Sequence, residues 1–419
     1  MCWSPAGVRR YARNCRWAAA GGTNALKVTL SLGSQSFQRQ LAVTLAKRGM
    51  LARALSFGLD AEILDPDSEG ELRLVRRYRH YRLANRVMWA AWRRLPLTSR
   101  SRHLPIVIST AYSDWLLSRG LPHCDLFHGW TSLCRAGLPQ AKRHGAVTLV
   151  ENPSMHPRAW QNAVLSECEA WGVRPRDCRG LLPEPLIRRM ESEFKRADFV
   201  VVPSAIAARS FECAETAAKP LVVHAGIDAN FFRPADGRRD DKTFRVVYAG
   251  RVELAKGVVY LLQAWKKLAL HGAELVMVGE VAPEMGELIR EFATGNVRFE
   301  GLLPAERLAE AYRTADVMAF PSVNEGLARV LLEAMASGLP VVATDCSGAE
   351  DCVTPGADGT VVPARDADAL AKALEWHYEN REATREMGRA ARAKIEGGFT
   401  VEHYEERMIR TYFEVAKRR

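Results

Sequence analysis

The strongest constraint on the fold is the alternation of short apolar runs with helical patterns along most of the chain. Runs such as ALKVTLSL (25–32), FRVVYAG (244–250) and DVMAFPS (316–322) are each followed by a turn and a helix-like segment. Strands that alternate with helices are typical of parallel sheets covered by helices. We therefore predict an α/β protein of two doubly wound, Rossmann-like domains that face a cleft, with ligand at the carboxyl ends of the strands.

The same pattern divides the 419 residues, which are more than a single core usually holds. The polar stretch 233–243 reads as a linker, a helix is expected over 36–48, and another from Lys256. We predict an N-terminal extension over 1–24, a first domain over 25–236, a second over 237–398 and a final helix over 399–419. Further strands are expected at 51–57, 124–128, 146–150, 198–204, 219–224, 273–279, 297–301, 340–344 and 359–363.

Composition and cysteine spacing argue against a membrane-spanning, disulfide-rich or zinc-binding protein. With 47% apolar and 26% charged residues the chain resembles an ordinary globular protein, and it has no apolar run of about 18 residues. Residues 1–24 are Arg-rich and lack a secretory pattern, which leaves an organelle-transit segment, a disordered extension or a start codon placed too far upstream. Nine scattered cysteines without a C-x-x-C pair indicate neither disulfides nor zinc, and a reducing cytoplasm is expected.

The stretch FPSVNEGLARVLLEAMASGLPVVATD (320–345) carries Glu325 and Glu333 around a predicted helix start. Glu325 is expected just before the helix and Glu333 in its third turn, roughly 12 Å apart along the axis. That separation exceeds the about 5–10 Å of a glycosidase pair. Free N–H groups at a helix start favour phosphate. A carboxylate, a phosphate site and a second carboxylate match the outline of a sugar nucleotide.

A second feature lies in VVYAGRVELAKGVVYLLQAW (246–265). Arg251 follows a strand end at Gly250, and Lys256 precedes the next helix. Two cations five residues apart, with glycines at 250 and 257, suit a diphosphate, although basic residues at such turns are more often solvated surface.

Together these stretches resemble the retaining nucleotide-sugar glycosyltransferases of the GT-B fold, glycosyltransferase family 4. AGIDANFFRP (225–234) and SGAEDCVTPGADGTVVPARDADALAKAL (347–374) are also similar to that family. The resemblance covers about residues 26–412. It implies transfer of a sugar, of hexosyl type, from a nucleotide-diphosphate sugar to an acceptor hydroxyl with retention, in the biosynthesis of polysaccharide, lipopolysaccharide or glycolipid. It also implies an acceptor-binding first domain, a donor-binding second domain and a last helix, 399–418, that crosses back onto the first domain.

The resemblance assigns roles to single residues. Arg251 and Lys256 would bind the donor diphosphate, Glu325 the donor-sugar hydroxyls and Glu333 the ribose hydroxyls. The backbone of 326–330, with Gly326, Leu327 and Ala328, would meet the distal phosphate; Ala328 replaces the family's usual glycine, and its methyl group could crowd that phosphate.

The first domain should supply the Gly33 loop, which would face the diphosphate, and a histidine. His156 in ENPSMHP resembles the family's loop histidine near the sugar, with a capping or packing role as the alternative; for His128 a buried packing role is the favoured reading. No cofactor and no metal are expected, because Arg251, Lys256 and a helix start can stabilise the leaving diphosphate.

Charge is unevenly distributed. The net charge is +10, and residues 1–105 hold 19 Lys/Arg against 6 Asp/Glu. On a helix over 72–102 the arginines at 79, 82, 86 and 93 would form one stripe beside Trp89. Such a stripe suits an anionic membrane, and hence a lipid-linked acceptor and a peripheral location at the inner face; a solvated helix face and a soluble anionic partner are the alternatives.

Two other classes of function stay open at this point. One is a catalytically silent GT-B protein that acts as a scaffold, for which Ala328 is the only hint. The other is nucleic-acid binding through the basic residues, which we do not expect because the rest of the chain is slightly acidic and has no nucleic-acid motif.

Overall fold

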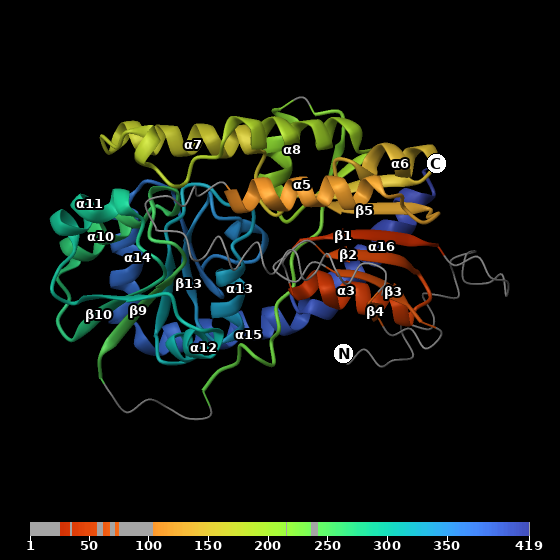
Figure 1. Cartoon of the computed structure of the whole chain (residues 1–419). Helices are drawn as coiled ribbons and strands as arrows, with labels where there is room; N and C mark the ends of the chain where they lie inside the picture. Colours follow the sequence, from red (N-terminus) through yellow and green to blue (C-terminus); the bar gives the residue numbers. More distant parts are fainter. Residues whose placement is uncertain are drawn as a thin grey trace.

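The computed structural model contains one mainly parallel and one fully parallel sheet, each covered by helices (Figure 1). The structure describes residues 26–33, 36–56, 62–67, 72–74, 104–214, 216–235 and 242–418. All statements below concern these residues. The predicted extension over 1–24 and part of the linker, 236–241, lie outside them.

The first sheet has eight strands in the order β4-β3-β2-β1-β5-β6-β7-β8. All its pairings are parallel except β2–β3 and β3–β4, which are antiparallel. The strands are β1 (Val28–Leu32), β2 (Leu51–Ser56), β3 (Glu62–Pro66), β4 (Leu72–Leu74), β5 (Leu126–Trp130), β6 (Val147–Glu151), β7 (Phe199–Val202) and β8 (Lys219–Val222).

The second sheet has six strands, all parallel, in the order β11-β10-β9-β12-β13-β14. Most of its strand residues are apolar and fully buried, as a sheet covered on both faces requires. The strands are β9 (Phe244–Ala249), β10 (Ala273–Val278), β11 (Val297–Gly301), β12 (Val317–Phe320), β13 (Val341–Thr344) and β14 (Gly359–Val362).

Helices connect these strands and cover both sheets. Those between the first-sheet strands are α3 (Ser36–Lys47), α5 (Leu104–Ser118), α6 (Gly137–Arg143), α7 (Pro157–Ala170), η3 (Pro175–Asp177), α8 (Glu184–Arg196) and α9 (Ala205–Glu212). The later ones are η4 (Leu254–Lys256), α10 (Val258–Leu268), η5 (Pro283–Met285), α11 (Gly286–Phe292), α12 (Ala305–Arg313), α13 (Arg329–Ala336), η6 (Ala349–Asp351), α14 (Ala367–Glu379), α15 (Arg381–Gly398) and α16 (Val401–Ala416).

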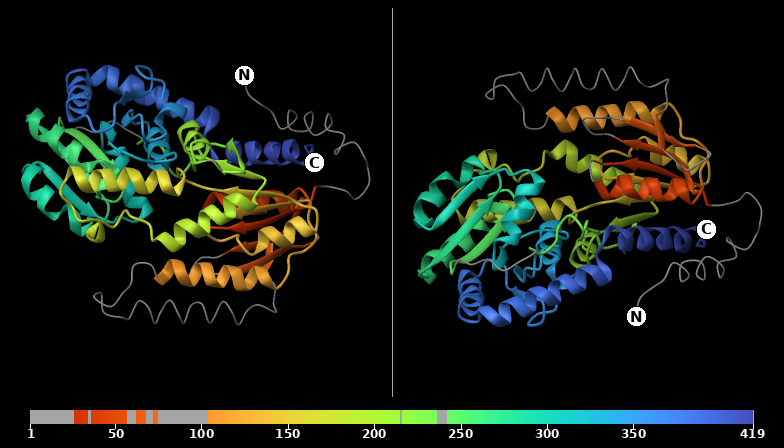
Figure 2. Two further views of the ribbon diagram at one scale, coloured as in Figure 1. Left: turned by 90° about the horizontal axis from the view of Figure 1, so that it is seen from above. Right: turned by 90° about the horizontal axis from the view of Figure 1, so that it is seen from below.

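The last helix, α16, crosses back to the first domain, as expected. It lies beside the first sheet in both views of Figure 2 and contacts α3. Its apolar face belongs to the hydrophobic core of the first domain. Just before the helix, Thr400 forms an isolated parallel β-bridge with Ile227. The residues of α16 in that core are Val401, Tyr404, Met408, Ile409, Tyr412 and Val415.

A second crossing was not expected. Helix α7 and the loop through η3, residues 157–181, precede α8 in the chain, yet α7 lies over the second domain (Figure 1). Val164, Cys168 and Cys178 belong to the hydrophobic core that contains the second sheet. We call residues 157–181 the strap. The sequence interval predicted for the first domain therefore also contributes to the second core.

Three further details differ from the expectations. Strands β3 and β4 and helix α5 were not predicted, and residues 72–74 form a strand where the start of a basic helix was expected. The arginine stripe itself, at 79–93, lies outside the described residues. Helix α13 begins at Arg329, so Glu333 lies in its second turn rather than its third.

Candidate functional site

A cavity of about 260 Å³ lies between the two domains. From the first domain it is lined by the strand ends of β5 and β6 and by loops that follow β6, β7 and β8; from the second, by the ends of β9 and β12 and the start of α13. Its lining residues are Phe37, Trp130, Glu151, Asn152, Pro153, Pro203, Val223, Ala225, Ala249, Gly250, Lys256, Phe320, Glu325, Leu327, Ala328, Arg329 and Val330.

Strand order explains the position of the cavity. In the second sheet the chain runs from β9 outward to β10 and β11 and then returns to the other side of β9 with β12. In the first sheet the corresponding reversal lies between β1 and β5. Loops diverge at such reversals and leave a crevice at the carboxyl ends of the strands. Gly250 and Trp130, which both line the cavity, are found at these reversals.

Lys256 and Glu325, predicted from separate motifs, meet at this cavity. The Nζ of Lys256 forms an ion pair with Oε2 of Glu325, and the ammonium also lies 5.3 Å from the ring centroid of Trp160 in the strap. Gly257 makes the turn after η4 with φ of +61°, and a Cβ there would lie 2.0 Å from the carbonyl oxygen of Pro321. The turn that aims Lys256 at Glu325 thus requires glycine.

The segment before α13 forms part of the cavity wall. Leu327 and Ala328 line it, and no side-chain hydrogen bond caps the start of the helix. The N–H of Ala328 donates to the carbonyl oxygen of Ser347 (3.3 Å). This arrangement suits a phosphate at the helix start, as the sequence predicted.

At Gly326 the two domains touch through their backbones. A Cβ at this position would lie 2.7 Å from the carbonyl oxygen of Pro153, and the hydroxyl of Ser204 donates to the carbonyl oxygen of Gly326 (2.5 Å). Only glycine allows this approach, so Gly326 has an interdomain role in addition to any contact with phosphate.

Two predicted ligand residues do not line the cavity. The side chain of Arg251 is 52% exposed, and its Nη2 lies 3.1 Å from Oε1 of the buried Glu253, whose pKa is raised by burial. Glu333 is buried inside the second domain, where Tyr312 donates to its Oε2 (3.3 Å) and burial raises its pKa.

His156, the first-domain histidine predicted to lie near the sugar, is buried away from the cavity. His156 is 2% exposed, its Nδ1 accepts from the N–H of Arg158 at the start of α7, and its ring packs against Phe194 and Phe211. It is not among the cavity-lining residues, and its contacts are those of the capping and packing alternative. Burial lowers its pKa.

Gly33 and His128 lie beside the cavity wall. The N–H of Gly33 donates to Oε1 of Gln38 (2.9 Å), and a Cβ on Gly33 would lie 2.9 Å from the ring of Trp130. His128 is buried and has Tyr412 of α16 at its Nδ1 (2.7 Å), in line with the packing role favoured for it.

Sequence reasoning missed several lining residues, chiefly Phe37, Trp130, Glu151 and Asn152, and for Arg329 it predicted only a backbone contact. Trp130 and Glu151 are the last residues of β5 and β6. The rule that ligands bind at the carboxyl ends of parallel strands could have identified both. Arg329 follows the E-G-L-A stretch directly, and its guanidinium carbon lies 5.5 Å from the ring centroid of Phe37.

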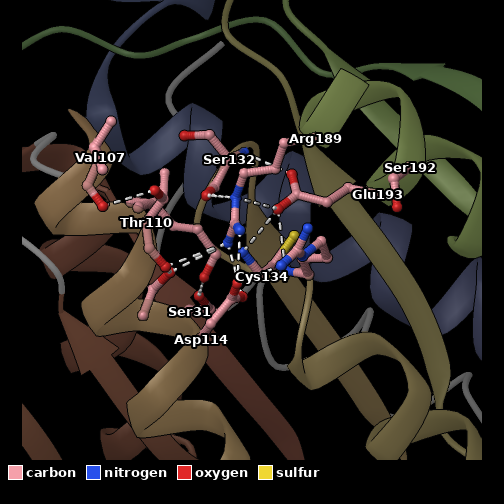
Figure 3. A network of polar contacts seen from close by, with 12 residues as sticks. Ser31, Val107, Thr110, Asp114, Ser132, Cys134, Arg189, Ser192 and Glu193 are labelled. Carbon is pink, nitrogen blue, oxygen red and sulfur yellow. Dashed lines mark hydrogen bonds and ion pairs between the residues drawn. The ribbon is translucent and has the colours of Figure 1, made fainter. Parts of the chain in front are cut away.

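A buried polar network holds the loop after β5 (Figure 3). Arg189 of α8 makes two contacts with the Asp114 carboxylate, of 2.6 and 2.8 Å, and donates to the carbonyl oxygen of Ser132. Glu193 accepts from the backbone N–H groups of Ser132 and Arg135 (2.5 and 3.0 Å). Burial raises the pKa of Glu193 to about 7. The network fixes the loop that follows Trp130.

Among the described residues, no group of three or more His, Cys, Asp or Glu side chains is arranged to hold a metal ion. No described helix is long and apolar enough to cross a membrane.

Two Rossmann-like domains with a cavity at facing strand ends and a helix that returns to the first domain define the GT-B class of fold. Residues 231–394, which span the second sheet, match the family Glycosyl transferases group 1. Two solved structures have the same fold. One is sucrose-phosphate synthase from Thermosynechococcus elongatus (TM-score 0.70, 20% identity, 94% of this chain and 100% of that chain). The other is Anabaena HepE in complex with UDP (0.61, 16%, 92% and 99%).

Two curated glycosyltransferases are also similar in sequence to this chain. A sulfoquinovosyl transferase of Arabidopsis thaliana is 30% identical over 53% of this chain and 46% of its own length, so the chain spans about half of it. A D-inositol 3-phosphate glycosyltransferase of Nocardia farcinica is 28% identical over 75% and 68%. The second domain and these relatives thus show similarity to group 1 glycosyltransferases, and the solved structures show the GT-B fold.

Proposed function

We propose that the protein transfers a sugar from a nucleotide-diphosphate sugar to an acceptor hydroxyl with retention of configuration, as a hexosyltransferase of family 4 type. The observation that carries the proposal is the Lys256–Glu325 ion pair in the interdomain cavity. It joins a cation suited to a diphosphate with a carboxylate suited to sugar hydroxyls, beside an uncapped helix start. HepE, which shares the fold, has been solved with UDP-glucose.

In the proposed reaction the residues act mainly through charge. Lys256 and the N–H groups before α13 stabilise the negative charge that develops on the diphosphate as the anomeric bond breaks. Glu325 orients the donor sugar, and the acceptor hydroxyl attacks from the same face. Arg251, Glu333, His156 and Gly33 remain proposed ligands from the resemblance; none of them lines the cavity, and the side chains of Arg251, Glu333 and His156 would have to turn toward it. No metal and no cofactor take part in the proposal.

Thermal stabilisation by UDP-, GDP- and ADP-sugars tests the proposal, because a ligand that binds the native state raises the melting temperature. We expect one nucleotide series to stabilise the wild type and to lose most of that effect in Lys256→Ala and Glu325→Ala. The anomeric configuration of the product, read by NMR, tests retention. If no series stabilises the wild type, with or without a divalent metal, a catalytically silent scaffold replaces the proposal.

The acceptor and location are proposed from the sequence alone. A lipid-linked acceptor in polysaccharide, lipopolysaccharide or glycolipid biosynthesis would place the protein in the cytoplasm, at the inner face of a membrane, through residues 72–102. Flotation with anionic liposomes that falls with salt would support this. Unchanged flotation after charge reversal at positions 82, 86 and 93 would contradict it.

A further inference from the structure

We propose that Glu151 and the neighbouring Asn152 form a sugar-hydroxyl subsite on the first-domain wall of the cavity. This inference rests on the proposed function and extends it to residues that neither the motifs nor the comparisons assign. Both residues line the cavity, at the end of β6.

Glu151 is the ionisable residue that the first domain contributes to the cavity lining. The others in the lining belong to the second domain: Lys256 and Glu325 pair with each other, and Arg329 lies over Phe37 and 3.9 Å from Glu333. Glu151 is thus the carboxylate that faces the ligand space from the opposite wall. It is 7% exposed, so its oxygens must be satisfied by protein or by ligand.

The hydrogen-bond partners of Glu151 leave one of its carboxylate oxygens able to accept a further hydrogen bond. Gln38 donates from Nε2 to Oε2 (3.0 Å), and the Nε2 of His128 lies 3.3 Å from the same oxygen. The hydroxyl of Tyr404 lies 3.2 Å from both oxygens and can donate to only one at a time. An ionised carboxylate accepts about four hydrogen bonds. Oε1 can therefore accept at least one more.

Asn152 supplies a second acceptor next to it. Its Nδ2 donates to the carbonyl oxygens of Ser154 and Met155 (2.6 and 3.2 Å), which fixes the orientation of the amide. Its Oδ1 is buried and has no partner among the described residues. A buried acceptor without a donor is costly, and a ligand hydroxyl would satisfy it.

The chemistry of Glu151 and Asn152 indicates which groups of a ligand they can bind. A carboxylate and an amide oxygen offer acceptors only, so they repel phosphate and suit groups that donate, of which sugar hydroxyls are the class that the proposed reaction brings to the cavity. The hydroxyls belong either to the transferred sugar or to a sugar of the acceptor.

The position of Glu151 is held from two sides. Gln38 bridges it to Gly33, because its Oε1 accepts from the Gly33 N–H (2.9 Å). Tyr404 connects it to α16. The subsite is therefore built jointly by the loop after β1 and by the last helix.

The test compares Glu151→Gln, which removes the charge at constant shape, with Tyr404→Phe, which removes a supporting hydrogen bond and leaves the carboxylate. Calorimetric titrations use UDP, GDP and ADP beside UDP-glucose, GDP-mannose and ADP-glucose. For the series that binds, we expect Glu151→Gln to keep nucleoside-diphosphate affinity within about twofold and to weaken nucleotide-sugar affinity roughly tenfold or more. Tyr404→Phe should lower the melting temperature and keep the wild-type ratio of the two affinities.

A second titration separates the two sources of hydroxyls. If nucleotide-sugar affinity is unchanged but free glucose or mannose no longer binds the diphosphate-loaded Glu151→Gln protein, the subsite serves the acceptor. The inference is overturned if the affinities of Glu151→Gln for nucleoside diphosphate, nucleotide sugar and free sugar all match the wild type, or if Tyr404→Phe changes the ratio as much as Glu151→Gln. Glu151→Asp, with the carboxylate withdrawn by one methylene, takes the place of Glu151→Gln if the latter fails to fold. If the wild type binds none of the six nucleotides, the proposed function itself fails.

Discussion

Lys256 and Arg251 lie five residues apart, but their side chains have different surroundings. Lys256 lines the cavity in its ion pair with Glu325, whereas Arg251 points to Glu253 and is half exposed. We predict that Lys256→Gln weakens nucleoside-diphosphate binding roughly 10- to 100-fold, the cost of a charged hydrogen bond, and Arg251→Gln less than threefold. Calorimetry measures both. Equal losses would mean that Arg251 turns into the cavity when ligand binds.

His377 should make the stability of the second domain depend on pH. It is fully buried between α14 and α15, with Thr384 Oγ1 2.9 Å from its Nδ1, and burial lowers its pKa to about 4. The unfolded chain, with an ordinary pKa near 6.5, binds the proton more readily. Stability is therefore fully present above about pH 6.5 and falls as the pH drops toward 4, by roughly 2–3 kcal/mol between pH 7 and 4.5.

Urea unfolding at several pH values checks this for the wild type and for His377→Gln. The variant lacks the titrating group, so its stability should change less over the same pH interval. A wild-type slope equal to that of the variant would contradict the prediction.

At the scale of elements, the strap is anchored by Glu167 of α7. Its buried carboxylate accepts from the hydroxyl of Tyr260 (3.0 Å) and from Nε of Arg365 (2.6 Å), both in the second domain. We predict that Glu167→Ala lowers the free energy of unfolding by roughly 2–3 kcal/mol, because Tyr260 then loses its acceptor in a buried position. Glu169→Ala, at an exposed position of the same helix, is the control and should change it by less than about 0.5 kcal/mol. Urea unfolding followed by tryptophan fluorescence measures the difference.

The predicted strands were found because each is a continuous apolar run bounded by turn residues, as FVVV in β7 and VMAF in β12 illustrate. The strands that sequence missed, EILDP and LRL, carry charged residues and pair antiparallel, so they lack that continuous apolar pattern. For α7, nothing local in the sequence specifies which of the two sheets the helix will cover.

The site was predictable where a residue belongs to a motif. Lys256 and Glu325 were identified by spacing and resemblance, and the structure brings them together. Glu151 belongs to no motif, and although the end of β6 sets its place, its side chain is held by Gln38 and Tyr404, distant partners that no local pattern predicts. The orientation of Arg251 is likewise set by the burial of Glu253, a tertiary property.

At the scale of the whole molecule, α16 belongs to the first domain's core. Its six buried side chains, at roughly 1.5–3 kcal/mol each, contribute on the order of 10 kcal/mol, which is comparable with the stability of an entire domain. We predict that a chain ended at Gly398 loses protection from hydrogen exchange in β1, β2 and β5. A chain ended at Ala416, which keeps the helix, should retain it. Retained protection in the shorter chain would show that the first domain is stable without α16.

The close approach at Gly326 has a consequence for kinetics. Ser204 and Pro153 hold the second domain's backbone against the first, and the cavity volume of about 260 Å³ lies below the roughly 300–1,000 Å³ of ligand pockets. We predict that a nucleotide sugar binds only after these backbones separate. In stopped-flow measurements the observed binding rate would then level off at high ligand concentration, at a value set by opening of the protein rather than by diffusion.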